Sequence, residues 1–531
     1  MAHRSHGPVT LARRGAFTRF LDTVEWLGNL LPHPVTLFAL FAAGTLLASG
    51  LLAWLGFSVT DPRPAGAAGR APDGMIEVVN LLGADGLRRI VEGFVTNFTG
   101  FAPLGVVLVA LLGVAVAERS GLLAAVIRSL VMGARRDTVT VAIVFAGILS
   151  NAASEMGYVV LVPMAAAIFH SLGRHPLAGL AAAFAGVSGG YSANLVIGTI
   201  DPLLAGLTQQ SARLMDPDYA VHPLVNWYFM IASTFLVTLL GWWVTARIVE
   251  PKLGRWDPAG ASAELGAAPP LERLSAAERR GLRRAGLAAL VLAALIAWTV
   301  IPADGVLRNP QTGGVLHSPF LNGVVAFIFV MFLVPGFVYG RATGTMRNDR
   351  DLIRAMDEGM RTLGLYIVLV FFAAQFVAWF GWSNIGTITA VLGARALEAV
   401  GLTGPVFFLL FIPFCAFLNL AIGSASAKWA ITAPIFVPML MLLGYSPELT
   451  QAAYRVGDSV SNVITPMMSY FGLILAFATR YVRNLGIGTL IATMLPYTLV
   501  FLLGWTAFFY LYVFVLGLPL GPAAPLYWPA R

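Results

Sequence analysis

Residues 423–439 read GSASAKWAITAPIFVPM, and they interrupt an apolar stretch that runs from residue 404 to residue 444. A membrane-spanning helix needs about 20 mostly apolar residues, so this stretch is too long for one crossing. Small polar residues and prolines break it in the middle. Broken backbone is stable in a bilayer only where protein or a cavity surrounds it. The stretch therefore predicts a re-entrant hairpin of two half-helices.

The first half of the chain carries a matching interruption. The apolar stretch 139–169 contains SNAASEMGYVVLVPM at residues 150–164, which again ends in Val-Pro-Met after a small polar tip. Each predicted hairpin is followed by an apolar stretch with its own polar break, at residues 189–202 in the first half and 457–466 in the second. We therefore expect two hairpins, each followed by a broken spanning helix.

The composition is that of an integral membrane protein. Of the 531 residues, 58% are hydrophobic and 11% are charged, and the mean hydropathy is +0.79. Soluble domains carry about 25% charged residues, so this chain has too few charges to cover several soluble domains. Cys415 is the single cysteine, which excludes a disulfide framework and a thiolate metal site.

The basic residues orient the chain in the membrane. We place the N-terminus in the cytoplasm and expect nine crossings and two hairpins, of which the first opens to the cytoplasm and the second to the outside. The cytoplasmic segments then hold 24 of the 34 Lys and Arg, the external segments hold 8, and the spans hold Lys428 and Arg455. This bias agrees with the positive-inside rule, and it explains the net charge of +8 without a nucleic-acid partner. The alternative is ten or eleven plain spans.

The predicted fold class is an all-α integral membrane protein with about nine transmembrane helices, two re-entrant helical hairpins and an inverted repeat. The predicted segments are a cytoplasmic tail (1–34), scaffold spans (35–136), a first transport unit with hairpin 1, a broken helix and the following span (137–248), a cytoplasmic linker (249–284), further scaffold spans (285–383), a second transport unit with hairpin 2 and a broken helix (384–484), and the last span with the C-terminal tail (485–531).

An inverted pair of interrupted helices is typical of the binding site of a secondary transporter. Free N–H groups at helix ends favour an anionic group, while carbonyls and Asn side chains favour a cation. The alternative is that the small residues only serve close helix packing.

Few ionisable residues fall in the apolar stretches, and most of them lie in the repeated units. Arg455 and Asp458 are three residues apart and share a helix face. Either they form an ion pair with each other, or Arg455 holds a substrate carboxylate and Asp458 carries a proton or cation. Asp201 precedes Pro202 in the first broken helix, where it either takes part in coupling or caps the half-helix that follows.

Other side chains in the breaks also have two interpretations. Trp429 either stacks on an aromatic ligand or packs in the core, and Lys428 can extend to the membrane interface. The amides of Asn151, Asn194 and Asn462 either hold a ligand or cap helices. The seven histidines lie in tails, loops or span ends, so any proton coupling falls to carboxylates. A Walker loop and an H-E-x-x-H motif are absent from the sequence, which disfavours an ATP-driven pump and a membrane enzyme.

At these residues the chain resembles the AbgT family of p-aminobenzoyl-glutamate transporters, within a wider ion-transporter superfamily, from about Phe17 to Phe514. The resemblance is strongest at residues 150–154, 157–161, 192–202, 424–429 and 454–466. It implies a homodimer in the bacterial inner membrane. It also implies uptake of p-aminobenzoyl-glutamate or export of p-aminobenzoic acid-like antimetabolites such as sulfonamides, driven by the proton motive force.

The resemblance also implies site residues. The family's functional positions map onto Asp201, Trp429, Pro447, Arg455, Asp458 and Pro466. In all, we assign substrate binding to Trp429, Arg455, Asn194, Asn462 and Ser426, ion or proton coupling to Asp201, Asp458, Asn151 and Glu155, and helix breaks to Pro447 and Pro466. Glu155 and Met156 depart from the family pattern, which has Asp and a small residue at the first tip.

The expected partners are a small anionic aromatic substrate, H⁺ or Na⁺, the lipid bilayer and a second copy of the chain. We expect no catalytic residue, no metal site and no cofactor other than a Na⁺ at the hairpin tips. A sodium-coupled dicarboxylate symporter is the close alternative, and a channel is the alternative from another class.

Overall fold

The computed structural model describes residues 32–66, 70–153, 156–256, 273–315, 318–483 and 485–528. Apart from a short antiparallel pair, β1 (Ser58–Thr60) and β2 (Met75–Glu77), the regular structure of these residues is helical. Eight of the described helices are long and apolar enough to cross a membrane. The predicted all-α membrane fold is confirmed.

Seven of the described spans lie outside the two hairpins and the two broken helices. They are α2 (Pro34–Trp54), α3 (Ala84–Thr99) leading into α4 (Ala102–Arg119), α10 (Trp227–Val244), α12 (Ala276–Val300), α14 (Val324–Thr343), α16 (Gly364–Trp382) and α22 (Ile487–Tyr510). The eighth helix, α19 (Ala425–Leu442), is one arm of the second predicted hairpin. Without α19, the seven spans and the two broken helices make up the nine expected crossings.

Both hairpins form. The first consists of α6 (Val139–Ser150), a 3₁₀ turn (Asn151–Ala153) and a π-helical turn (Gly157–Leu161) that continues into α7 (Val162–Ser171). The second consists of α18 (Val406–Ala421) and α19. Between these arms, a Cβ added to Gly423 would lie 2.7 Å from the backbone oxygen of Met467, so only glycine lets the tip approach the second helix break this closely.

A broken helix follows each hairpin. The first is α8 (Pro176–Phe184) with a π-helical turn (Ala185–Gly189), an irregular segment, and α9 (Ile200–Ala212). The second is α20 (Pro447–Val460) with a 3₁₀ turn (Asn462–Ile464), an irregular segment, and α21 (Phe471–Tyr481). The two units thus contain the same elements in the same order.

Glycine lets each broken helix cross the first arm of its own hairpin at close range. A Cβ added to Gly186 would lie 2.4 Å from the backbone oxygen of Val144 on α6. A Cβ added to Gly457 would lie 2.4 Å from the backbone oxygen of Ile412 on α18. Because the two crossings repeat the same contact, they support the repeat that the sequence predicts.

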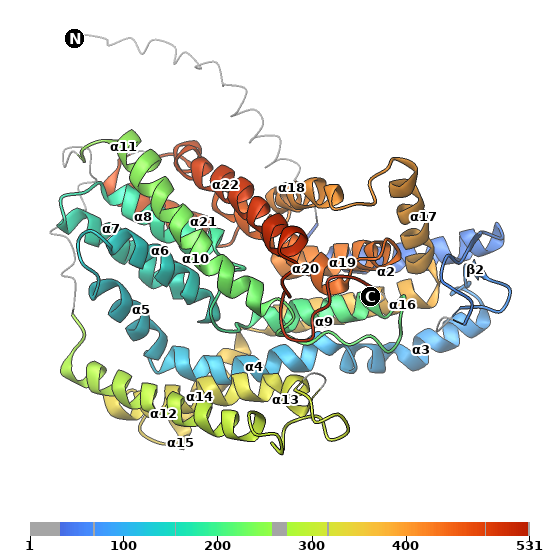
Figure 1. Ribbon diagram of the computed structural model, residues 1–531, viewed down its shortest axis with the longest axis horizontal. Helices are drawn as coiled ribbons and strands as arrows, with labels where there is room; N and C mark the ends of the chain where they lie inside the picture. The colour runs from blue at the N-terminus through green and yellow to red at the C-terminus, as the bar shows by residue number, and fades with distance from the viewer. Residues whose placement is uncertain are drawn as a thin grey trace, which may run out of the picture.

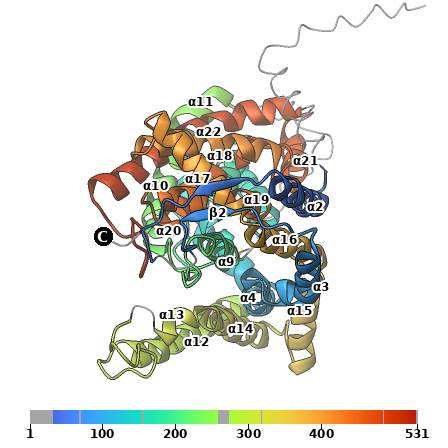
Figure 2. The same cartoon turned by 90° about the vertical axis from the view of Figure 1, so that its right-hand side faces the viewer.

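Helices α3 and α4 run along the long axis of the molecule, whereas α10 and α22 run obliquely to it (Figure 1). In the side view, α12, α13 (Pro319–Asn322), α14 and α15 (Asp349–Arg361) form a layer that lies apart from the two hairpin units, and α4 lies between them (Figure 2). The remaining helical elements are α5 (Leu122–Met132), a π-helical turn (Thr245–Val249), α11 (Glu250–Leu253), α17 (Ile385–Ala399) and a π-helical turn (Leu511–Val515).

The predicted linker at 249–284 has helical residues at both of its ends. Helix α12 begins at Ala276, inside that range, because Ser275 and Glu278 form a capping box in which each side chain accepts a hydrogen bond from the other's backbone N–H. At the N-terminal end of the predicted linker, α11 continues the preceding span, α10, to Leu253. Residues 257–272 lie outside the described residues.

Candidate functional site

The two broken helices contact each other at their breaks. The side-chain amide of Asn462 donates a hydrogen bond to the backbone oxygen of Ser188 (3.1 Å). The backbone N–H of Ser192 donates to the hydroxyl of Ser459 (3.1 Å). Each bond joins one repeat to the other, so the two interruptions meet inside the protein.

Two further predicted asparagines hold the first break against the first hairpin. Asn151 at the hairpin tip donates from Nδ2 to the backbone oxygen of Val187 (2.9 Å), and Asn194 in the break donates to that of Ile148 (3.4 Å). Both bonds cross from one element to another, so neither is a cap of the residue's own helix. Asn151 Oδ1 is buried and has no hydrogen-bond partner in the described part of the chain.

Arg455 forms its ion pair across the repeats. Its Nη2 lies 2.6 Å from Oδ1 of Asp201, and both side chains are at most 3% exposed. Of the two alternatives for Arg455 and Asp458, the ion pair with each other is not the arrangement found. The two residues share a face of α20, but each pairs with a residue of another element. Asp201 also accepts a hydrogen bond from the backbone N–H of Gly198 (2.7 Å), which ties the first turn of α9 to the irregular segment before it.

Asp458 pairs instead with Lys428. The two charged atoms are 2.5 Å apart, and the Lys428 ammonium also donates to Oδ1 of Asn419. Tyr454 donates from its hydroxyl to the backbone oxygen of Ala425 (2.6 Å) and to Asp458 (3.2 Å). The alternative in which Lys428 extends to the interface is not the arrangement found, because its side chain is 1% exposed.

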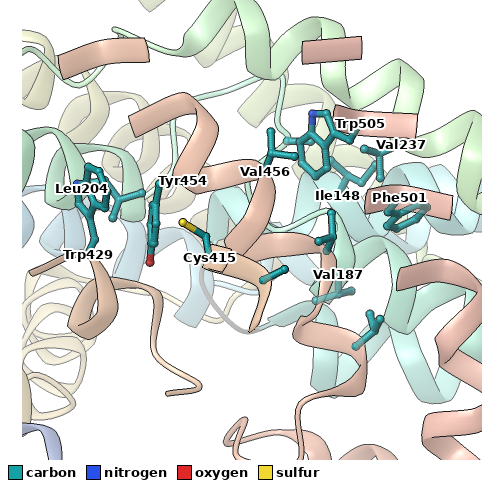
Figure 3. Packing of buried hydrophobic residues seen from close by; sticks show 14 of the residues in the cluster. Ile148, Val187, Leu204, Val237, Cys415, Trp429, Tyr454, Val456, Phe501 and Trp505 are labelled. Atoms are coloured by element: carbon teal, nitrogen blue, oxygen red, sulfur yellow. The ribbon is translucent and has the colours of Figure 1, made fainter. Parts of the chain in front are cut away.

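Trp429 is sealed in the core. It is fully buried and lies beside Leu204 and Tyr454 in Figure 3, with its ring centroid 4.4 Å from that of Tyr454. Its indole N–H donates to the hydroxyl of Thr208 (2.8 Å). The core-packing interpretation therefore describes Trp429 in this conformation.

A cavity of about 750 Å³ lies beside these contacts. The second hairpin tip lines it with five consecutive residues, 423–427, and the first half contributes the tip residue Asn151. Helices α2, α4 and α16 also contribute to its lining. Of the predicted site residues, Asn151, Ser426 and Asn462 line this cavity, whereas Trp429, Arg455, Asp201, Asp458 and Asn194 lie outside its lining.

The two predicted helix-breaking prolines lie in different settings. Pro466 lies in the irregular segment of the second broken helix, as expected. Pro447 is instead the first residue of α20, where a missing N–H costs nothing, so it begins a helix rather than breaking one. Glu155 lies outside the described residues.

Sequence reasoning missed several residues that build the site. Asn419 is the largest omission, because its amide donates to the backbone oxygen of Asp458 (2.9 Å), the hydroxyl of Ser461 (3.0 Å) and Oδ1 of Asn462 (2.6 Å). A single polar residue in the apolar run of α18 was a signal that could have identified it. Thr208 gave no such signal, because its sequence neighbours are ordinary for a helix.

Among the described residues, no group of three or more His, Cys, Asp and Glu side chains is arranged to hold a metal ion. The polar groups of the site are those of hairpin tips, helix breaks and two buried ion pairs. This arrangement can hold a solute by hydrogen bonds.

Comparison with known proteins shows the family. The model of the AbgT putative transporter family matches residues 19–528. The p-aminobenzoyl-glutamate transport protein of Escherichia coli K12 is 39% identical over 500 residues, which cover 94% of this chain and 95% of the relative.

Two solved structures are also similar. MtrF of Neisseria gonorrhoeae, described as illuminating a class of antimetabolite efflux pumps, is 60% identical, with a TM-score of 0.90 over 96% of this chain and 100% of MtrF. The YdaH transporter of Alcanivorax borkumensis is 47% identical, with a TM-score of 0.85 over 92% of this chain and 100% of YdaH. The chain is thus a multi-pass membrane transporter rather than an enzyme, and it belongs to the AbgT putative transporter family.

Proposed function

We propose that this chain is a secondary active transporter of p-aminobenzoyl-glutamate and related p-aminobenzoic acid-type compounds, including sulfonamide antimetabolites, coupled to the proton motive force. The names of its relatives support the substrate class. The observation that carries the proposal is the cavity of about 750 Å³ into which the tips of both hairpins project. Site-forming residues at an interface between repeats are the usual architecture of such carriers.

The second hairpin tip supplies the support for anion binding. Helix α19 begins there, with Ser424 as its N-cap, and residues 423–427 face the cavity. A helix N-terminus attracts a carboxylate because its first N–H groups lack helical acceptors and because the helix dipole is positive there. Ser426 adds a hydroxyl, and Asn462 adds a side chain from the second break.

The buried carboxylates support proton coupling. In our proposal Asp458 exchanges a proton during the cycle, since its pairing with Lys428 and Tyr454 places it directly behind the tip of hairpin 2. Asp201 and Arg455 hold the two repeats together. Arg455 Nε has no acceptor within the described ranges, which leaves it able to receive a substrate carboxylate if the core rearranges.

We further propose that the protein is a homodimer in the bacterial inner membrane with its N-terminus in the cytoplasm. The bias of 24 cytoplasmic against 8 external basic residues supports this orientation. In this orientation the cavity reaches the cytoplasmic ends of α2 and α16, because Pro34 and Leu365 line it. The conformation is then inward-facing, and alternating access moves the hairpin units against α2, α4 and α16.

One observation favours the sodium-coupled alternative. Asn151 Oδ1 is buried at the first tip, lines the cavity and lacks a donor within the described residues. A Na⁺ ion at a hairpin tip is bound by oxygen atoms of this kind. Proton and sodium coupling therefore have to be separated by measurement.

The test is uptake of radiolabelled p-aminobenzoyl-glutamate into proteoliposomes under an imposed pH gradient or an imposed Na⁺ gradient. We expect accumulation with the pH gradient, no change when choline replaces Na⁺, and counter-flow of unlabelled substrate. Accumulation that requires Na⁺ would establish the alternative. Gradient dissipation without counter-flow would show a channel and overturn the proposal.

A further inference from the structure

The cavity wall is aromatic and carries little charge. Four tyrosines contribute to its lining: Tyr158, Tyr191, Tyr366 and Tyr470. Asp, Glu, Lys and Arg do not occur among the residues that line it within the described ranges. A solute in this cavity therefore meets ring faces and hydroxyl groups before it meets a charged side chain.

Two of these tyrosines stack in parallel across the repeats. The rings of Tyr158, from the first hairpin, and Tyr470, from the segment after the second break, have centroids 4.7 Å apart and an interplanar angle of 1°. Both tyrosines line the cavity, but Tyr158 is only 3% exposed, whereas Tyr470 is partly buried and exposes more of its surface. The pair thus offers a ring at the cavity wall.

Hydrogen bonds hold Tyr158, the more buried ring of this pair, in place. The hydroxyl of Tyr158 donates to the hydroxyl of Ser188 (3.3 Å), which donates to the sulfur of Met468 (3.2 Å). Ser188 belongs to the first broken helix and Met468 to the second break, so both repeats hold Tyr158, on which the Tyr470 ring stacks. A preorganised ring loses little conformational freedom when a ligand stacks on it.

We propose that the stacked pair Tyr158–Tyr470 is the binding platform for the aromatic ring of the substrate. This inference rests on the proposed function and deepens it. Trp429 cannot serve in this conformation, because it is fully buried and its ring is stacked on Tyr454. The aminobenzoyl ring stacks on Tyr470 instead, and the platform selects aryl carboxylates over aliphatic dicarboxylates.

The expected contribution of the platform is measurable. Aromatic pairs contribute beyond their buried area, and loss of one such contact lowers affinity by roughly 2- to 10-fold. Tyr470→Leu is therefore expected to weaken binding of p-aminobenzoyl-glutamate and of p-aminobenzoate by about this factor. Weak binding of N-acetylglutamate, which has no ring, is expected to stay unchanged.

The test is calorimetric titration of the three compounds into purified protein in nanodiscs. Tyr470→Phe keeps the ring and is expected to bind as the wild type does. The control Tyr228→Leu removes a tyrosine that is 40% exposed on α10 and outside the cavity lining, and it is expected to change nothing. If Tyr470→Leu does not fold, Tyr470→Met keeps an unbranched apolar side chain without a ring face and takes its place.

Two outcomes overturn the platform. The first is an unchanged affinity of Tyr470→Leu for both aryl compounds. The second is wild-type protein that binds N-acetylglutamate as tightly as p-aminobenzoyl-glutamate. Both outcomes leave the proposed transport of p-aminobenzoyl-glutamate standing, whereas wild-type protein that binds none of the three compounds overturns the proposed function together with the platform.

Discussion

Removing the carboxylate of Asp458 tests whether its buried ion pair both stabilises the core and couples protons. Asp458→Asn preserves the shape of the side chain but leaves the Lys428 ammonium with Asn419 and no counter-charge. Both side chains of the pair are at most 2% exposed. Removing one partner of such a buried pair costs about 3–5 kcal/mol. We therefore expect a lower Tm in detergent and loss of proton-driven uptake.

A double variant separates the two roles. Buried ion pairs can often be replaced by apolar residues of similar volume without loss of stability. Lys428→Met combined with Asp458→Leu is therefore expected to recover most of the wild-type Tm while uptake under a pH gradient stays absent. A wild-type Tm for Asp458→Asn alone would refute the energetic reasoning. Proton-driven uptake by the double variant would refute the coupling role.

Three further predictions concern packing, pH and Trp429. Gly457→Ala places a Cβ 2.4 Å from the backbone oxygen of Ile412 and should cost about 1–3 kcal/mol of stability, read as a lower Tm. Burial disfavours the charged form of Asp61, but hydrogen bonds from Arg63 outweigh it and hold the pKa of Asp61 below its ordinary 3.8. The stabilisation by Asp61 is therefore present above pH 3.8 and is lost as the pH falls through the lower folded value; Asp61→Asn should remove this acid dependence of the Tm. Trp429→Phe loses an indole hydrogen bond, which should lower the Tm and kcat for transport while leaving KM unchanged, because the ring lies outside the cavity lining.

Each of these predictions has a control or a contrary result. Gly472→Ala, at a glycine of α21 whose added Cβ meets nothing within 4 Å, should leave the Tm unchanged or slightly higher. An acid melting profile of Asp61→Asn that matches the wild type would show that Asp61 does not set it. A raised KM in Trp429→Phe at wild-type Tm would return Trp429 to a ligand-binding role.

The interruptions of the fold could be predicted because they are local. Residues 150–164 and 423–439 place small polar residues inside apolar stretches that are too long for one crossing. The hydrocarbon core of a bilayer tolerates such broken backbone only where protein or a cavity surrounds it. The hairpins and broken helices therefore follow from the chain itself. The start of α12 at Ala276 also had a local signal, because Ser275 and Glu278 have the spacing of a capping box. The charged residues around this signal favoured the prediction of a linker instead.

The pairing of charges could not be predicted in the same way. Spacing places Arg455 and Asp458 on one face of α20, yet each pairs with a residue that is distant in the sequence, Asp201 or Lys428. Tertiary packing decides between partners of similar chemistry, and the local pattern contains no information about it. The exclusion of Trp429 from the cavity has the same cause, since its neighbours come from α9 and α20.

The ion pair between Arg455 and Asp201 restricts how the molecule can change shape. One charge belongs to each repeat. Tilting a single repeat by itself would therefore leave the Arg455 guanidinium without its counter-charge inside the protein, at a cost of several kcal/mol. Both hairpin units are therefore expected to travel as one rigid body. This rigid body then has to slide along α2, α4 and α16, and the cavity already lies at that boundary.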